Sequence, residues 1–100
     1  NNLTLHNIML ARVFISVPHE TELKNYAPHT DLDVEHTVVI YYVNDADGDT
    51  VLFDKQGNIV KSVTPKKGRV LMFDGSITHS GGIPRKGPRC IVNYDIQIKQ

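Results

Sequence analysis

The chain has 100 residues, and its eleven Lys and Arg balance eleven Asp and Glu, so the formal net charge is zero. A neutral chain lacks the clustered positive charge that binding to nucleic-acid phosphates requires, and a hydrophobic fraction of 40% is typical of a folded globular domain. The longest apolar run, Val38 to Val43, is too short to span a membrane, and the single cysteine, Cys90, excludes an internal disulfide and indicates a reducing, cytoplasmic compartment.

The predicted elements are short β-branched runs separated by proline and glycine. Helix is expected in only two places: residues 3–11 are typical of the end of a helix, and the polar residues 19–26 of one or two helical turns. Strands are expected, in chain order, at residues 12–17, 37–43, 50–53, 58–64, 69–73 and 89–99. Short strands with glycine turns at this spacing predict a mainly all-β protein, an antiparallel sandwich or barrel.

Alternation along two of these strands predicts how they are buried. In residues 89–99 one face is apolar and is expected to meet a core, whereas the face that carries Arg89, Asn93 and Asp95 is mostly polar and is expected to line a wet cavity near Arg89. The strand at 37–43 is apolar on both faces, so both should be covered. We therefore expect flanking helices or a partner subunit, as in a homo-oligomer, to lie against it.

Three residues form a candidate metal site. His29 and Asp31 are two residues apart, so on an extended chain they face the same way, and His79 lies fifty residues later. Two histidines and one carboxylate on one side of a ferrous ion leave three positions open for other ligands. A His-x-Asp tripeptide is common by chance, and Asp33 and His36 are alternative donors nearby.

The surrounding motifs resemble those of the prolyl 4-hydroxylase-like 2-oxoglutarate/Fe(II)-dependent dioxygenases. Residues 26–31 (YAPHTD) are similar to the first metal motif of that family, residues 37–44 (TVVIYYVN) to the strand after it, and residues 79–84 (HSGGIP) to the distal-histidine motif. Residues 48–54 and 63–73 are similar to the hairpin and the strand pair between these motifs, and Arg89 stands ten residues after His79. The order and spacing of these motifs, rather than any one of them, carry the resemblance.

The resemblance implies a fold, an activity and a set of site residues. It implies a double-stranded β-helix, the jelly-roll or cupin-like core, over residues 1–100 as one domain, without the N-terminal helices that brace the sheet in family members. It implies Fe(II), bound by His29, Asp31 and His79, with 2-oxoglutarate as co-substrate, O2, and ascorbate as an accessory reductant. Arg89 and Tyr41 would hold the far carboxylate of 2-oxoglutarate, and Tyr26 would support its iron-bound end.

The implied reaction is hydroxylation of an unactivated C–H bond, most simply of a prolyl residue in a protein or peptide or of an amino-acid-like molecule, with decarboxylation of 2-oxoglutarate to succinate. Two alternatives remain open at this point: a non-catalytic metal- or ligand-binding cupin-like module, and a structural β-domain of a larger assembly. The acidic run Asp45 to Asp49 is not an EF-hand, because Thr50 and Gln56 stand where that loop needs Gly and Glu.

Overall fold

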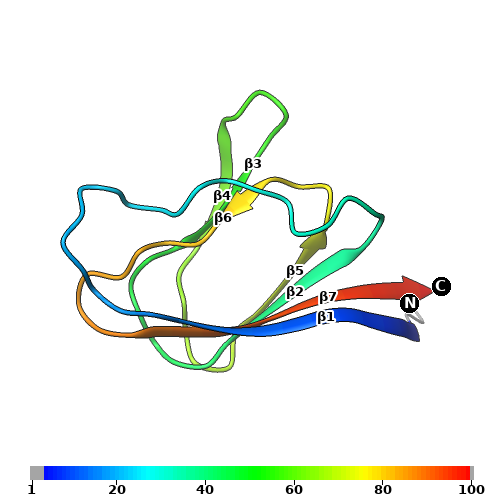
Figure 1. Cartoon of the computed structure of the whole chain (residues 1–100), viewed down its shortest axis with the longest axis horizontal. Helices are drawn as coiled ribbons and strands as arrows, with labels where there is room; N and C mark the ends of the chain where they lie inside the picture. Colours follow the sequence, from blue (N-terminus) through cyan, green and yellow to red (C-terminus); the bar gives the residue numbers. More distant parts are fainter. Residues whose placement is uncertain (1–3, 100) are drawn as a thin grey trace.

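The computed structural model describes residues 4–99, which form seven strands in two antiparallel sheets (Figure 1). The larger sheet has the order β1-β7-β2-β5 and the smaller one the order β4-β3-β6. The strands are β1 (Thr4–Ser16), β2 (Thr37–Tyr42), β3 (Thr50–Phe53), β4 (Ile59–Val63), β5 (Val70–Asp74), β6 (His79–Ser80) and β7 (Arg89–Lys99). The all-β, jelly-roll prediction is confirmed, and residues 4–99 contain no helix long and apolar enough to cross a membrane.

The N-terminal helix prediction is wrong, because residues 4–11 belong to β1; Leu3 lies outside the described residues. Leu5, Ile8 and Ala11 are three residues apart, which is the spacing of a helix face. In the structure they pair with Ile98, Ile96 and Tyr94 of β7, which are only two residues apart. A register shift between each pair on β1 accommodates the extra residue, so bulges produce the helix-like spacing.

The second helix prediction, over residues 19–26, is also wrong: this segment is irregular. Its backbone is bonded to the loop that precedes β7 rather than to itself. The amide of Ile83 donates to the carbonyl of Lys24 at 2.8 Å, and the amide of Tyr26 donates to the carbonyl of Gly81 at 2.9 Å. The guanidinium of Arg85 donates to two further carbonyls of the segment, which fixes its path across the molecule.

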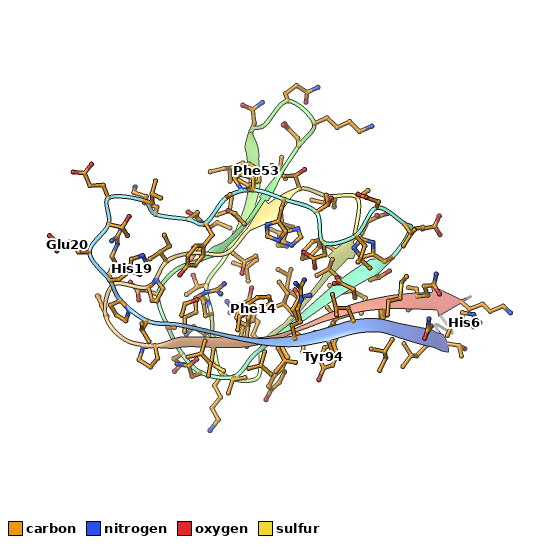
Figure 2. All side chains as sticks on the ribbon, viewed as in Figure 1. His6, Phe14, His19, Glu20, Phe53 and Tyr94 are labelled. Carbon is orange, nitrogen blue, oxygen red and sulfur yellow. The ribbon has the colours of Figure 1, made fainter. Side chains whose placement is uncertain are left out.

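The core lies between the two sheets and is built mainly from the inner face of β2, with Val38 and Tyr42 fully buried and Ile40 3% exposed. The prediction for β7 is wrong in part. Its polar face, with Arg89, Asn93 and Asp95, is the buried one, and its apolar face points outward. Figure 2 shows the two sides: Phe14 of β1 lies between the sheets and Tyr94 lies on the outside. Polar side chains are buried here because they surround the site described below.

The outer face of the larger sheet is apolar and uncovered by residues 4–99. Val13 is 62% exposed, Met72 53% and Tyr41 40%, although each belongs to a paired strand. Exposed apolar residues in such a row are unusual for a free surface. The expectation that helices or a partner subunit cover this face stays a prediction.

Candidate metal centre and co-substrate pocket

The smaller sheet brings the three predicted metal ligands together. His29 and Asp31 lie in the connection between β1 and β2, and His79 begins β6. The connection is extended at His29, whose amide and carbonyl bond to the carbonyl and amide of His79 at 2.9 and 3.0 Å. This bridge sets His29 directly beside His79. Asp31, two residues on, then faces the same point.

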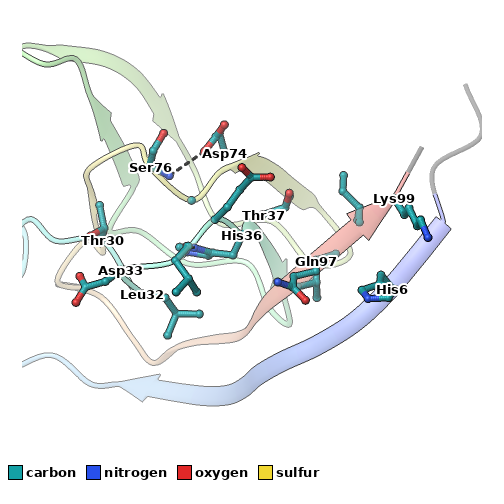
Figure 3. A pocket seen from close by; sticks show the side chains of 15 residues that line it. His6, Thr30, Leu32, Asp33, His36, Thr37, Asp74, Ser76, Gln97 and Lys99 are labelled. Carbon is teal, nitrogen blue, oxygen red and sulfur yellow. Dashed lines mark hydrogen bonds between the residues drawn. The ribbon is translucent and has the colours of Figure 1, made fainter.

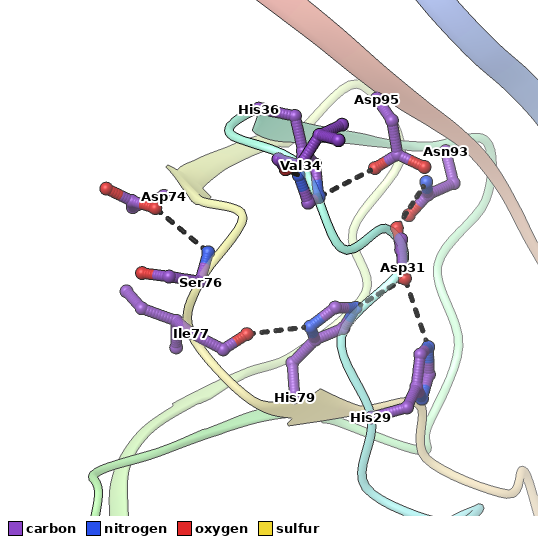
Figure 4. A network of polar contacts seen from close by, with 10 residues as sticks. All are labelled: His29, Asp31, Val34, His36, Asp74, Ser76, Ile77, His79, Asn93 and Asp95. Atoms are coloured by element: carbon purple, nitrogen blue, oxygen red, sulfur yellow. Dashed lines mark hydrogen bonds and ion pairs between the residues drawn. The ribbon is translucent and has the colours of Figure 1, made fainter.

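The donor atoms are spaced as one metal ion requires (Figure 4). Oδ1 of Asp31 is 3.1 Å from Nε2 of His29 and 3.2 Å from Nε2 of His79. One ligand atom from each residue lies within 4.8 Å of the others. Adjacent corners of an octahedron with bonds of about 2.1 Å are about 3 Å apart. The geometry and the donor types therefore fit an ion bound by two histidines and one carboxylate, the set typical of non-haem Fe(II).

Backbone carbonyls orient both histidines. Nδ1 of His29 lies 3.1 Å from the carbonyl oxygen of Ala27, and Nδ1 of His79 lies 3.1 Å from that of Ile77. A carbonyl can only accept, so in the neutral ring Nδ1 carries the proton and Nε2 has the free lone pair. A backbone carbonyl is a common hydrogen-bond partner of the second ring nitrogen in metal-binding histidines. The third ligand is oriented by Asn93, whose amide donates to Oδ2 of Asp31 at 3.1 Å and leaves Oδ1 toward the histidines.

Electrostatics favour an ionised carboxylate at this point. Burial by itself would raise the pKa of Asp31, but hydrogen bonds from His79, Asp95 and Asn93 outweigh it and hold the pKa well below 3.8. Burial would lower the pKa of His79, and the hydrogen bond and charge of Asp31 instead raise it above 6.5. Desolvation and the adjacent Asp31 raise the pKa of Asp95 to about 6. The two carboxyl groups can hydrogen-bond when Asp95 is protonated.

Arg89 is a buried cation without an acidic partner within 4 Å among residues 4–99. It is 3% exposed, and burial lowers the pKa of its guanidinium, which still stays charged. Nε donates to the carbonyl of Gly48 at 2.7 Å and Nη2 to the hydroxyl of Thr50 at 2.8 Å. A buried charge is costly unless it is paired, so this guanidinium is suited to an anionic ligand.

Arg89 and the three metal ligands line one cavity of about 510 Å³, a size suited to small molecules. Both polar and apolar residues line it; the lining includes Arg12, Phe14, Tyr26, His29, Asp31, Ile40, Thr50, His79, Arg89, Ile91 and Asn93. A larger hollow of about 890 Å³ lies near the C-terminal end of β7 and includes His6, Asp33, His36 and Asp74 (Figure 3). It contains neither the metal ligands nor Arg89, so the smaller cavity is the candidate active site.

The remaining residues predicted for the site, the tyrosines and the alternative metal ligands, lie in different places in the structure. Tyr26 lines the cavity, and its role at the iron-bound end of 2-oxoglutarate stays a prediction. The expectation for Tyr41 is wrong, because alternation along β2 turns its side chain to the outer face of the sheet. Tyr42 points inward instead, and its hydroxyl donates to the hydroxyl oxygen of Thr50 at 2.7 Å, next to Arg89. Of the alternative metal ligands, Asp33 is exposed and His36 is buried beside Asp95, outside the three-residue cluster.

Sequence reasoning missed three residues that complete the site: Thr50 and Tyr42 beside Arg89, and Asn93 on Asp31. Asn93 is four residues after Arg89, so the polar face of β7 was a signal that could have identified it. Nothing local marks Thr50, because it meets Arg89 only through the contact of the two sheets.

The family comparison agrees with this geometry. The model of the 2OG-Fe(II) oxygenase superfamily matches residues 16–96, and the chain therefore belongs to this superfamily. Membership implies a dioxygenase that uses Fe(II), O2 and 2-oxoglutarate as co-substrate. No curated protein matches the chain.

Proposed function

We propose that the chain is a prolyl 4-hydroxylase-like dioxygenase that hydroxylates an unactivated C–H bond of a prolyl residue or of an amino-acid-like substrate, with decarboxylation of 2-oxoglutarate to succinate. One observation carries the proposal. A set of two histidines and one carboxylate, and a buried guanidinium with no acidic partner within 4 Å in residues 4–99, open into the same cavity. A metal-binding module would use the first feature but has no use for the second.

His29, Asp31 and His79 would hold the iron, which together with O2 supplies the oxidising power for C–H hydroxylation. Because Nδ1 of both histidines is hydrogen-bonded to a carbonyl oxygen, Nε2 is the nitrogen that would bind the ion once its proton is lost. The protein also aims one oxygen of Asp31 at the ion by occupying the other with Asn93. The side chains of Asp31 and His79 are only 2% and 5% exposed, so water has little access to these two ligands.

Arg89 would bind the far carboxylate of 2-oxoglutarate through charge-assisted hydrogen bonds. Nη1 has no hydrogen-bond partner in the described part of the chain and is the free donor for this task. Asn44 fixes the position of Arg89 from both sides: its side chain accepts from the amide of Cys90 and donates to the carbonyl of Pro88, each at 2.9 Å. The position of the co-substrate is thus set by the start of β7.

A second guanidinium bears on the substrate. Arg12 lines the cavity from β1, pairs across the strands with Asn93, and lies 5.2 Å from the centre of the Phe14 ring. The guanidinium of Arg12 lies over the Phe14 ring, and the residue is exposed. Its positive charge is therefore available to a ligand that enters from solvent. Arg12 is suited to the carboxylate of a free amino acid, so within the proposal the amino-acid-like substrate is favoured over a residue inside a peptide.

Succinate formation tests the proposal. Purified protein with Fe(II) and 2-oxoglutarate is assayed against L-proline, L-prolinamide and a proline-containing peptide, with His79→Ala as the inactive control. Turnover of L-proline above that of L-prolinamide, with the preference lost in Arg12→Gln, is the expected result. Equal turnover of L-proline and L-prolinamide would contradict the role given to Arg12, but not the rest of the proposal.

Binding under anaerobic conditions separates an enzyme from a binding module. Fe(II) and 2-oxoglutarate together should give a weak visible metal-to-ligand charge-transfer band that is absent in His79→Ala. Metal uptake without this band would favour the cupin-like module instead. Stimulation by ascorbate and a cytoplasmic location stay predictions, which omission of ascorbate from the assay and cell fractionation would check.

A further inference from the structure

A glycine borders the cavity at the end where the co-substrate carboxylate is proposed to bind. Gly81 follows β6 and lines the cavity together with Arg89 and the metal ligands. A β-carbon built on Gly81 would lie 3.7 Å from Nη1 of Arg89 and 3.8 Å from Cδ2 of Tyr26. The missing side chain therefore leaves a space between the Tyr26 ring and the guanidinium nitrogen that has no hydrogen-bond partner in residues 4–99.

Neither the backbone nor the packing requires a glycine at position 81. The glycines in the left-handed region are Gly48, Gly57 and Gly68, and Gly81 is not among them. Contacts of 3.7 and 3.8 Å are ordinary van der Waals distances, whereas a β-carbon on Gly82 would lie 2.1 Å from a backbone carbon of Gly48. Alanine at a compatible position generally stabilises a protein by restricting its unfolded chain. Stability of the fold therefore does not explain Gly81.

Both walls of the space are held by hydrogen bonds. The amide of Tyr26 donates to the carbonyl of Gly81 at 2.9 Å, which fixes the backbone on one side. On the other side, Nε of Arg89 donates to the carbonyl of Gly48 and Nη2 donates to the hydroxyl of Thr50. The guanidinium cannot turn into the space without breaking these two bonds, so the space stays open to a ligand.

Such a space matters for a ligand that is bound at both ends. The metal ligands would fix one end of the co-substrate and Arg89 the other, so the distance between the two anchors does not change. An extra methylene in the ligand must then be accommodated by a sideways bend of its chain. In a closely packed site even one methylene is felt, so the bend needs an open space beside the chain, and Gly81 leaves one next to Nη1 of Arg89.

We propose that Gly81 is a specificity-determining residue that lets the co-substrate site take a 2-oxo dicarboxylic acid one methylene longer than 2-oxoglutarate. The bent chain of the longer acid occupies the space between Arg89 and Tyr26. A side chain at position 81 would fill this space and restrict the site to 2-oxoglutarate. The inference rests on the proposed function, because that function places the far carboxylate of the co-substrate at Arg89.

Ligand binding to the Zn(II)-loaded protein tests the proposal without any need for turnover. Dissociation constants for 2-oxoglutarate and for 2-oxoadipate, which is one methylene longer, are determined from the ligand dependence of thermal unfolding in wild type, Gly81→Ala and Gly81→Val. Oxalate is the control ligand, because it has no carboxylate left for Arg89 once it chelates the metal. Gly87→Val is the matched control variant, because Gly87 lies outside the cavity and its β-carbon would have nothing within 4 Å.

One methylene that a pocket does not fit changes discrimination about 10–200-fold. We therefore expect the wild type to bind the two diacids with dissociation constants within about 10-fold of each other, and Gly81→Val to raise the preference for 2-oxoglutarate by at least about 10-fold. Gly81→Ala should shift the preference in the same direction by a smaller factor, and it decides the question if Gly81→Val does not fold. Gly87→Val should keep the wild-type ratio, and oxalate should bind all the folded variants alike.

Two results would overturn the proposal. A wild type that binds 2-oxoglutarate but disfavours 2-oxoadipate by more than about 10-fold has no room for the extra methylene. An unchanged ratio of the two dissociation constants in the folded Gly81 variants would show that the longer acid does not use the space. Failure of the wild type to bind 2-oxoglutarate with Zn(II) would instead overturn the proposed function, and this inference with it.

Discussion

Replacing Arg89 by methionine removes the one buried charge that the proposed function assigns to 2-oxoglutarate, while keeping an unbranched side chain of similar reach. A hydrogen bond to a charged group contributes about 1.5–3 kcal/mol. Loss of about 2 kcal/mol weakens co-substrate binding about 30-fold. Because the contact is made equally in the bound and reacting states, the substitution should raise KM for 2-oxoglutarate and leave kcat nearly unchanged.

The same change is measurable as thermal stabilisation by 2-oxoglutarate, with Zn(II) in place of Fe(II) to prevent turnover. At a ligand concentration of 100 times Kd, the wild type gains about 2.7 kcal/mol, or roughly 11–22 °C in Tm for a domain of this size. At the same concentration the Arg89→Met protein gains only about 0.9 kcal/mol, or roughly 4–7 °C.

Without 2-oxoglutarate, the Arg89→Met substitution has two effects on the stability of the protein. Arg89→Met loses hydrogen bonds to Gly48 and Thr50 but also removes a buried charge, so the two effects oppose each other. Arg85→Met is the control: Arg85 is exposed and bonds only backbone carbonyls, so its variant should keep the full shift with 2-oxoglutarate. A full shift in Arg89→Met would refute the assignment of the carboxylate site.

Three further predictions concern pH, the buried tyrosine and a close backbone contact. A metal ion must displace the proton of His79, whose pKa is raised above 6.5. Co(II) affinity should therefore still increase as pH rises above 6.5, and an affinity that does not change with pH in this range would contradict the prediction. Burial raises the pKa of Tyr42 above 10, so neutral Tyr42 stabilises the fold below pH 10 and this contribution is lost as pH rises through the raised pKa. Tyr42→Phe should cost about 0.5–1.5 kcal/mol at neutral pH through its bond to Thr50, and denaturant unfolding should show the gap to wild type closing above pH 10. A β-carbon on Gly82 would lie 2.1 Å from a backbone carbon, so Gly82→Ala should lower stability by about 1–3 kcal/mol or more, whereas Gly87→Ala, with nothing within 4 Å, should not.

The N-terminal strand shows why a local pattern can mislead. The spacing of Leu5, Ile8 and Ala11 is that of a helix face, yet these residues pair with β7 through two bulges. A bulge depends on the partner strand, and no feature of residues 4–11 by themselves contains that information.

The choice between the two tyrosines shows a similar limit. Tyr41 and Tyr42 are adjacent, so which one faces the interior depends on which face of β2 is covered. Both faces of β2 are apolar in sequence, so alternation alone could not decide. The smaller sheet packs over the side that carries Tyr42, and this decides it.

The sequence by itself indicated the class of fold, through turns between short β-branched runs. The order and spacing of its motifs carried the family resemblance that predicted the metal-ligand triplet and the role of Arg89. Only the tertiary structure decided that the polar face of β7 is the buried one. Burial of Asn93 and Asp95 is favourable only where polar side chains from elsewhere in the chain lie against them. Those side chains, Asp31 and His36, belong to the connection between β1 and β2, some sixty residues away along the chain.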